Sequence, residues 1–297
     1  MRAKSTSDRI FEATAFVILL ILCISIIYPF WNLVVISFNT SADTARGGLT
    51  FWPRELTLEN YKMVFKDTRL LQAFFISASR TVLTTVLATM FTALFAYGLS
   101  RKELRFRKFY MKYCAVTMYV SGGLIPGYLL MQGLHLVNTF WVFVVPGLFS
   151  VWNMIIFRSF FDNISEGLIE AAKIDGAGEY TIFGKIVLPV SKPVIATLAL
   201  FTAVGQWNAW FDGAIYITDM KLMPLPTLLR QIINTNATSQ LLASMPGTAA
   251  EEMAKDMIST RSLSAATMML SIIPIVMVYP FLQKYFASGI MLGSVKE

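Results

Sequence analysis

Long runs of uncharged, mostly apolar residues alternate with shorter polar segments along the chain. A run of about 20 such residues can cross the roughly 30 Å hydrocarbon core of a bilayer as a helix. Five runs reach this length, and only the second is interrupted by a charge, at Arg80. The runs cover residues 13–42, 70–100, 113–157, 193–211 and 262–283.

The third run is long enough for two crossings. Its residues 131–139 include Gln132, Gly133, His135 and Asn138, which suit a hairpin between two helices. The first run is too long for the core of a signal peptide and lacks a small-residue cleavage site, so we expect it to be retained. The pattern therefore predicts an all-α, polytopic membrane protein with six transmembrane helices.

Composition supports the membrane assignment. Of the 297 residues, 56% are hydrophobic and only 14% are charged, whereas soluble domains carry roughly 25% charged residues. The mean hydropathy is +0.60. An ordinary soluble enzyme is thereby excluded. Cys23 and Cys114 lie inside apolar runs and are interpreted as small packing residues, not as a disulfide or a metal site.

The formal charge of +7 is unevenly distributed. With six helices, 15 of the 25 Lys and Arg residues fall on the face that carries both termini, nine fall on the other face, and Arg80 lies within the membrane. Short basic loops stay cytoplasmic, so the dense cluster at 101–108 predicts an N-in/C-in orientation. The basic residues are thus an orientation signal, and no nucleic-acid partner is expected.

A search for catalytic groups finds no usable set. His135 is the only histidine, which excludes metal clusters that need two histidines and histidine-based triads. The sequence has no GxxxxGK[ST] loop to hold nucleotide phosphates. We expect a non-catalytic chain that binds no cofactor, and any use of ATP would require a partner chain.

The segment between the fourth and fifth predicted helices is the most informative. Ser165 is a reasonable N-cap for a short amphipathic stretch, Gly176 interrupts it, and Pro189 stops a second apolar patch. Two short helices joined by a glycine break, on the cytoplasmic surface, fit this pattern. An interfacial helix that binds lipid headgroups is the alternative, but it would need several basic residues, and residues 168–178 hold Glu170 and Asp175 against Lys173 alone.

This segment resembles the EAA signature of permease subunits in bacterial ABC importers, in its carbohydrate-uptake form. The resemblance lies in Glu170-Ala171-Ala172, then Gly176, then Ile186, Leu188 and Pro189. It implies that the segment is a coupling helix that docks in a cleft of the ATP-binding subunit, with Glu170 paired to a basic residue there. The residues implied in ATPase coupling are Glu170, Ala171, Ala172, Asp175, Gly176, Ala177, Phe183, Ile186, Leu188 and Pro189.

The likeness covers nearly the whole chain. Residues 121–126, 207–216, 224–230 and 280–296 are similar to permeases for oligosaccharides released from plant and algal polysaccharides, several of which contain uronic acids (aldouronate, rhamnogalacturonan and alginate systems). The resemblance implies a type I importer fold in the bacterial inner membrane. It also implies a single permease domain over 1–297, with a cytoplasmic coupling segment at 163–189 and outer loops at 43–69 and 212–261.

The resemblance further implies the partners: a second, homologous permease subunit, two ATP-binding subunits that hold ATP and Mg, and an extracytoplasmic solute-binding protein. Membrane lipids surround the spans. The outer loop 212–261, with a charged stretch at 251–256, is expected to meet the binding protein. A solvated loop without a partner remains the alternative.

Arg80 is the sharpest candidate for contact with the sugar. It lies about ten residues, or about 15 Å, into the second predicted helix and shares a polar stripe with Ser77, Thr81 and Thr84. One interpretation is a fork-shaped donor for a sugar carboxylate. The other is an arginine that bonds helix carbonyls, or an acid on a neighbouring subunit, and so holds the bundle together.

Other polar or small residues are weaker candidates for the substrate path. Gly122, Gly123 and Pro126 allow either close helix packing or an unwound segment. Trp207, Asn208, Trp210 and Asp212 suit either an interfacial aromatic belt or an entrance that stacks on sugars. The remaining candidates are Tyr119, Trp152 and Asn153.

Three alternative functions are considered. An ion-coupled secondary transporter of sugars ordinarily carries acidic residues in its spans, and no span core here contains Asp or Glu. A membrane enzyme lacks the nucleophile, base or metal set that it would need. An ABC permease for neutral oligosaccharides remains open, since the sequence does not identify the sugar.

Overall fold

The computed structural model describes residues 6–48, 51–243 and 261–278. These residues are mainly helical, with an isolated antiparallel bridge between Asn39 and Leu56. The chain forms two compact units, Met1–Thr68 with Leu229–Ile272 and Arg69–Leu228 with Ile273–Glu297. The end of the last predicted span, the motif at 280–296 and the charged stretch at 251–256 lie outside the described residues.

Three described helices are long and apolar enough to cross a membrane by themselves: Arg9–Ser37, Thr68–Ser100 and Arg261–Val278. Three further pairs of helices pass the same test together but bend between their halves, by 115°, 43° and 83°. The described part of the chain thus has three straight candidate spans, or six if each bent pair is one span. The third run, which is long enough for two crossings, forms two of these bent pairs.

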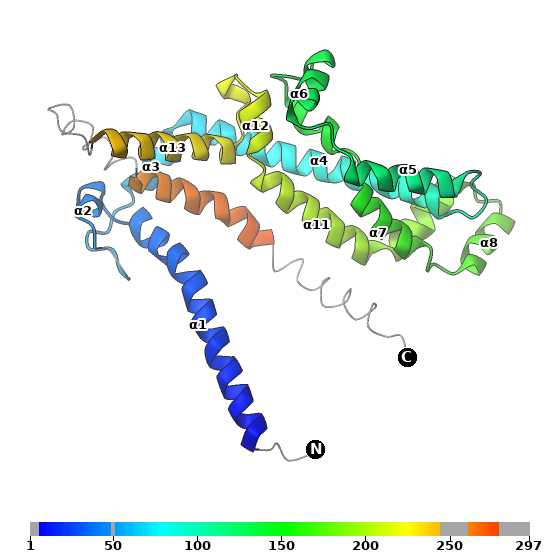
Figure 1. The fold of residues 1–297 in the computed structure, drawn as a ribbon, viewed down its shortest axis with the longest axis horizontal. Coiled ribbons are helices and arrows are strands. Elements are labelled where there is room, and N and C mark those ends of the chain that lie inside the picture. Colours follow the sequence, from blue (N-terminus) through cyan, green and yellow to red (C-terminus); the bar gives the residue numbers. More distant parts are fainter. Residues whose placement is uncertain (1–5, 49–50, 244–260, 279–297) are drawn as a thin grey trace. The chain divides into compact units, whose positions relative to one another are not determined.

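The first unit contains the N-terminal helix and the segment that follows it (Figure 1). Its elements are α1 (Thr6–Ser37), α2 (Ser41–Ala45), α3 (Glu59–Lys66), most of α13 (Leu225–Ala243) and most of the helix Arg261–Val278.

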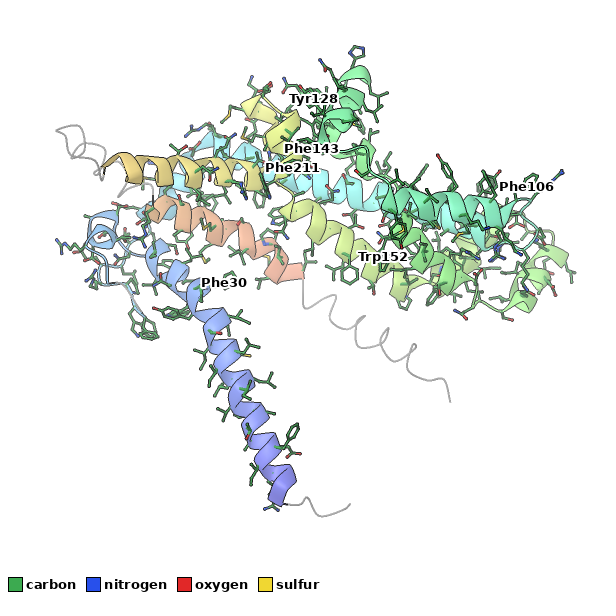
Figure 2. The ribbon with its side chains drawn as sticks, viewed as in Figure 1. Phe30, Phe106, Tyr128, Phe143, Trp152 and Phe211 are labelled. Atoms are coloured by element: carbon green, nitrogen blue, oxygen red, sulfur yellow. The ribbon has the colours of Figure 1, made fainter. Side chains whose placement is uncertain are left out.

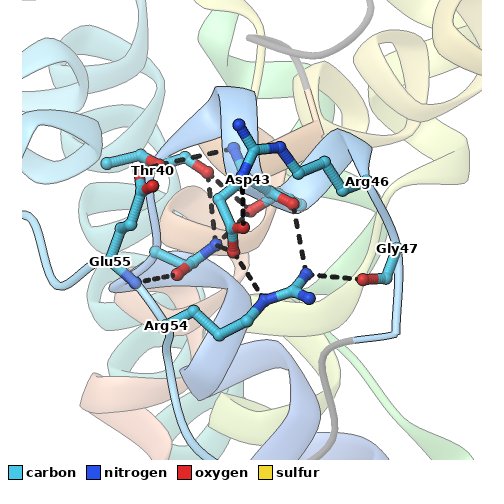
Figure 3. A network of polar contacts seen from close by, with 8 residues as sticks. Thr40, Asp43, Arg46, Gly47, Arg54 and Glu55 are labelled. Carbon is cyan, nitrogen blue, oxygen red and sulfur yellow. Dashed lines mark hydrogen bonds and ion pairs between the residues drawn. The ribbon is translucent and has the colours of Figure 1, made fainter.

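The predicted outer loop at 43–69 is an ordered structure in its first part. Asp43 is 3% exposed, and its Oδ2 accepts hydrogen bonds from Asn39 Nδ2 and Arg54 Nε, each at 2.9 Å. Arg54 Nη2 also donates to the carbonyl of Gly47 at 2.6 Å, and Thr40 Oγ1 donates to Glu55 Oε2 at 2.6 Å (Figure 3). These bonds close the turn after α1. They also give the buried carboxylate of Asp43 the hydrogen-bonding partners that a buried polar group needs.

The second unit contains the coupling segment and the helices around it. Its elements are α4 (Thr68–Ser100), α5 (Arg107–Tyr119), α6 (Leu124–Gly133), η1 (Phe140–Phe143), η2 (Val145–Gly147), α7 (Val151–Phe161), α8 (Glu166–Ile174), α9 (Glu179–Ile182), the π-helix η3 (Phe183–Val187), α10 (Leu188–Val190), α11 (Lys192–Asn208), α12 (Phe211–Tyr216), η4 (Met220–Leu222) and the start of α13.

The core of the second unit is one apolar cluster that joins α4, α5, α7, η3 and α11. Met154, Phe157 and Val187 are 0% exposed within it, and Ala96 and Leu198 pack there from α4 and α11. Because α4 supplies small residues at this level, the neighbouring helices approach it closely. Figure 1 shows α8 at one end of this bundle, next to the turn between α4 and α5.

The helical path breaks at Gly122 and Gly123. Helix α5 ends at Tyr119, Gly123 has φ of +84°, and α6 starts at Leu124 with a bend of 115° between the two helices. Glycine has no Cβ and adopts positive φ readily. The sequence allowed either close helix packing or an unwound segment at these glycines, and the structure has an unwound segment there.

The predicted hairpin at 131–139 is bound to α12. The backbone N–H of Asn138 donates to the carbonyl of Tyr216 at 2.8 Å. The side-chain Oδ1 of Asn138 accepts from the N–H groups of Thr218 and Asp219. Tyr128 of α6 stacks on Tyr216 with 5.9 Å between ring centroids. Figure 2 places Tyr128 and Phe143 at the end of the unit that carries α6 and α12, and Phe106 at the opposite end.

Candidate coupling segment and buried arginine site

The coupling segment folds as two short helices with a glycine break, as predicted. Helix α8 ends at Ile174, Gly176 has φ of +79°, and α9 begins at Glu179. A glycine in the left-handed conformation is a common helix terminator. Ser165 is the N-cap residue of α8, as predicted, although its side chain makes no capping hydrogen bond there.

One side of the segment is anchored in the bundle. Ile169, Phe183 and Val187 are buried in the apolar core of the second unit, and Ala172, Ala177, Ile186 and Leu188 pack against the same core. The Phe183 ring lies 5.3 Å from that of Tyr97 on α4. The apolar residues of the EAA pattern therefore join the segment to the spans, because they supply the side of the amphipathic stretch that avoids water.

The other side of the segment is exposed. Glu170, Ala171, Asp175, Gly176 and Pro189 are on this side. Two large apolar residues that sequence reasoning did not select as coupling residues also lie here: Ile174 is 86% exposed and Tyr180 is 82% exposed. The available signal was helical spacing, because Ile174 is out of phase with Ile169 and Ala172 on α8.

Ion pairs join the segment to the turn between α4 and α5. Lys102 contacts Glu166, Lys173 Nζ lies 3.0 Å from Glu103 Oε1, and Arg107 Nη2 lies 3.0 Å from Asp162 Oδ1. The hydrogen bond from Lys102 lowers the pKa of Glu166. Hydrogen bonds to Glu103 and then Glu179 raise the pKa of Lys173. Both shifts favour the charged form of the side chain, as expected beside a group of opposite charge.

Glu170 lies at the rim of a cavity of about 490 Å³ that these charged side chains surround. Its carboxylate and that of Asp175 have no hydrogen bond or ion pair with any described residue. The neighbouring charges of Glu166, Lys173 and Asp162 are all used within the chain. The segment thus offers two unpaired carboxylates beside the exposed apolar residues.

Arg80 occupies a closed site in the middle of α4. It is 0% exposed. Its Nη2 lies 2.6 Å from Asp212 Oδ2 and 3.1 Å from Gln206 Oε1, and its Nη1 lies 3.2 Å from Asp212 Oδ1. The guanidinium carbon lies 4.4 Å from the centroid of the Phe143 ring. Both ends of the guanidinium fork therefore already have partners.

The geometry favours the bundle-holding interpretation of Arg80, with one difference. The sequence suggested helix carbonyls or an acid on a neighbouring subunit as its partners. In the structure Nη1 lies 3.4 Å from the carbonyl of Ala209, and the acid is Asp212 of this chain, at the start of α12. The sequence missed this pair because Arg80 and Asp212 are 132 residues apart. Gln206, which completes the site, carried no sequence signal.

Of the other substrate-path candidates, Asp212 binds Arg80 directly, whereas the following four have other surroundings. Trp207 is buried and packs edge-on against Phe74 at 5.6 Å, and Asn208 Nδ2 donates to the carbonyl of Val204. Asn153 Nδ2 donates to Thr202 Oγ1 at 3.4 Å. Tyr119 is 88% exposed. The hydrogen bonds of Arg80 go to Ala209, Asp212 and Gln206, and to none of these four residues.

The described residues contain no group of three or more His, Cys, Asp or Glu side chains that could hold a metal ion. Both cysteines are interpreted from the sequence as small packing residues. Cys114 is buried in the second unit and fits this interpretation, whereas Cys23 is exposed on α1 and does not pack against other described parts of the chain.

Comparison with known proteins identifies the family. Residues 62–291 match the model of the binding-protein-dependent transport system inner membrane component. Among curated proteins, the chain is 37% identical over 270 residues to protein LplC of Bacillus subtilis (strain 168), which covers 91% of this chain and 89% of that protein. It is 34% identical over 289 residues to the polygalacturonan/rhamnogalacturonan transport system permease protein YtcP of the same organism, covering 97% and 99%.

A solved structure agrees with these matches. A crystal structure of a bacterial ABC transporter involved in the import of the acidic polysaccharide alginate matches 96% of this chain and 100% of the solved chain, with a TM-score of 0.85 and 28% identity. The resemblance to the carbohydrate-uptake branch is confirmed by these relatives, and so is the type I permease fold. The chain belongs to the family of inner-membrane components of binding-protein-dependent transport systems, as a multi-pass ABC transporter permease.

Proposed function

We propose that the chain is a permease subunit of an ATP-driven oligosaccharide importer. It forms the translocation path with a second, homologous permease, and it binds no cofactor itself. Two ATP-binding subunits carry ATP and Mg on the cytoplasmic side, and an extracytoplasmic solute-binding protein docks on the outer loops. In this proposal the chain is one permease domain with six spans and both termini inside.

The observation that carries this proposal is the exposed side of the coupling segment. Glu170 and Asp175 present unpaired carboxylates there, and Ile174 presents an apolar side chain that is 86% exposed. The nearby charges are neutralised within the chain. A partner with a basic group and an apolar cleft complements this surface, and an ATP-binding subunit is the partner that the EAA resemblance implies.

ATP-driven closure of the two ATPase subunits then moves the segment 163–189 together with the core that holds it. Phe183 and Val187 are buried against α4 and α7, so a displacement of the segment is passed to these helices instead of being absorbed at the surface. The spans then rock between inward-facing and outward-facing arrangements. A ligand or partner drives this change only if it binds one arrangement more tightly than the other.

The proposed cargo is an acidic, uronate-containing oligosaccharide. Support comes from relatives whose names concern alginate and polygalacturonan/rhamnogalacturonan. We assign the substrate path to the neighbourhood of Tyr119, Gly122, Gly123, Asn153, Trp207 and Asn208. Arg80 holds one wall of this path through Asp212. Neutral oligosaccharides are the second candidate, since other relatives are named for arabinooligosaccharides.

Co-purification of the assembled complex tests the coupling role. Glu170→Lys reverses the charge of the unpaired carboxylate, and we expect it to remove the ATP-binding subunits from the purified complex. Glu59→Lys makes the same change on an exposed residue of α3 and should leave them bound. Retention of the ATPase by the Glu170 variant would count against the proposal.

Substrate class is tested on the complete assembly with its binding protein. Uronate oligosaccharides and neutral arabinooligosaccharides of equal length are compared as stimulators of ATP hydrolysis. The proposal expects stimulation by the uronate series. Stimulation by the neutral series alone would transfer the assignment to the second candidate.

A further inference from the structure

Tyr97 fixes the inner end of α4 to the coupling segment. Its side chain is 4% exposed, and its hydroxyl donates a hydrogen bond to Glu179 Oε2 at 2.5 Å. The Phe183 ring lies 5.3 Å from its ring on one side, and the Arg101 guanidinium lies 4.6 Å over the ring. The tyrosine is thus held by contacts from both the segment and the turn after α4.

Glu179 and Lys173 lie on opposite sides of the glycine break. Lys173, the last basic residue of α8, has its Nζ 3.1 Å from Glu179 Oε1 and 3.0 Å from Glu103 Oε1. Gly176 between them has φ of +79°. The pair therefore spans the glycine break and links the two short helices to each other.

The contact between Tyr97 and Glu179 differs from the other links between the segment and this turn. Lys102 and Glu166 have side chains that are 76% and 60% exposed, and ion pairs at such exposure contribute little. Tyr97 is buried, and a hydrogen bond between a hydroxyl and a carboxylate is among the stronger kinds. The Glu179 side chain is 49% exposed, so this link is shielded from water only on its tyrosine side.

We propose that Tyr97 and Glu179 are positioning residues of the transport cycle. Their hydrogen bond makes α8, α9 and the inner end of α4 move as one body, so that displacement of the coupling segment reaches the span that carries Arg80. This inference rests on the proposed coupling function. It adds a residue pair outside the EAA pattern, one member of which lies on a membrane helix.

The test uses the complete importer in proteoliposomes and measures the amount of oligosaccharide imported per ATP hydrolysed. Tyr97→Phe removes the hydroxyl but keeps the ring that packs on Phe183. Loss of a hydrogen bond to a charged group shifts a coupled equilibrium by about tenfold or more. We expect a loss of about tenfold in import per ATP, with unchanged co-purification of the ATPase.

Three further variants separate positioning from general damage. Glu179→Ala also removes the ion pair with Lys173, so it should lose at least as much as Tyr97→Phe. The double variant should be no worse than Glu179→Ala, because both single changes remove the bond between Tyr97 and Glu179. Glu179→Gln keeps an acceptor for the tyrosine and should retain most of the coupling. Tyr113→Phe on α5, whose side chain is 64% exposed, is the matched control and should behave as the wild type.

One outcome overturns the inference: Tyr97→Phe imports as much per ATP as the wild type. This holds whether both rates stay at the wild-type level or fall together, as a purely structural defect would produce. Failure of the wild-type chain to bind an ATPase at all would instead reject the proposed function, so the two failures are distinguishable.

Discussion

The carboxylate of Asp212 binds both terminal nitrogens of the Arg80 guanidinium, at 3.2 and 2.6 Å. The bond joins the middle of α4 to the start of α12, just after α11 has ended at Asn208. An unpaired charge inside a bilayer is costly, and this pairing neutralises the one cation found in a predicted span core. The pair also fixes where the chain turns after α11.

Replacement of Arg80 should damage the fold before it alters any contact with a sugar. We expect Arg80→Ala to lower the free energy of unfolding by about 2–3 kcal/mol. This lies below the roughly 3–5 kcal/mol of a fully buried pair, because Asp212 is 28% exposed. The midpoint of thermal unfolding of the purified chain in detergent measures the effect.

The double variant Arg80→Met with Asp212→Leu provides the control. It removes both charges, so neither is left without its partner, and much of the stability should return. If the single variant were as stable as the wild type but imported uronate oligosaccharides poorly, Arg80 would belong to the sugar site and not to the wall of the path.

Gly213 allows α12 to pack against the start of α13. A Cβ atom at this position would overlap the hydroxyl of Thr227 and would lie 2.9 Å from Cδ of Pro224. Thr227 is itself held by a 2.7 Å hydrogen bond to the carbonyl of Trp210. Gly213→Ala should therefore destabilise the chain by about 1–3 kcal/mol, seen as a lower midpoint of thermal unfolding.

Gly205 is the matched control for that substitution. It lies within α11, and a Cβ there would meet nothing within 4 Å. Alanine is favoured over glycine in helices by about 1 kcal/mol, so Gly205→Ala should be neutral or stabilising. Equal destabilisation by both variants would show that the close contact with Thr227 is not the cause.

Ile174 should contribute to partner binding but not to the stability of the chain. Its side chain is 86% exposed at the end of α8, so Ile174→Ala removes no internal packing. We expect the variant to unfold at the wild-type temperature but to bind the ATP-binding subunits about fivefold or more weakly, as for a residue near the centre of an interface. Titration with purified ATPase subunits measures this affinity.

Ile125→Ala on α6 serves as the control, since this residue is also highly exposed, at 73%, but lies on another helix. Its affinity for the ATPase should be unchanged. A weakened affinity for both variants would point to a general effect of apolar truncation.

The first unit should lose stability in acid through Asp43. Hydrogen bonding from Asn39, followed by the interactions with Arg54, lowers the pKa of this carboxyl below its ordinary value of 3.8. A lowered pKa contributes stability that is present above the ordinary value and is lost as the pH falls through the folded value. The ordered turn after α1 is thus expected to loosen only at strongly acidic pH.

Fluorescence of Trp31 and Trp52, whose rings lie 5.7 Å apart in the same unit, follows this change. Asp43→Asn should be less stable than the wild type at neutral pH, and the difference should shrink as the pH falls below about 4. A pH-independent difference between the two proteins would reject Asp43 as the titrating group.

Much of the coupling segment was predictable from local pattern. The glycine break, the two short helices and the exposure of Glu170 follow from residues that are close together in the chain. The separation of its two sides was only partly predictable: Phe183 and Ile186, which the resemblance placed in ATPase coupling, pack inward against the core, whereas Ile174 is the residue that projects outward.

The sequence by itself determined the class of protein. Apolar runs of membrane length, the basic cluster at 101–108 and the spacing of the EAA residues are local properties, so they can be read without coordinates. They predict a helical membrane protein and locate the segment that resembles the EAA signature.

Only the tertiary structure decided which polar residues have partners. Arg80 finds Asp212 across 132 residues, and Tyr97 finds Glu179 across 82. Such pairs depend on how the chain bends between the two residues. Between Arg80 and Asp212, for example, the chain bends by 83° before α11. A bend at one residue moves every distant residue after it, and the sum of several bends has no local signal in the sequence.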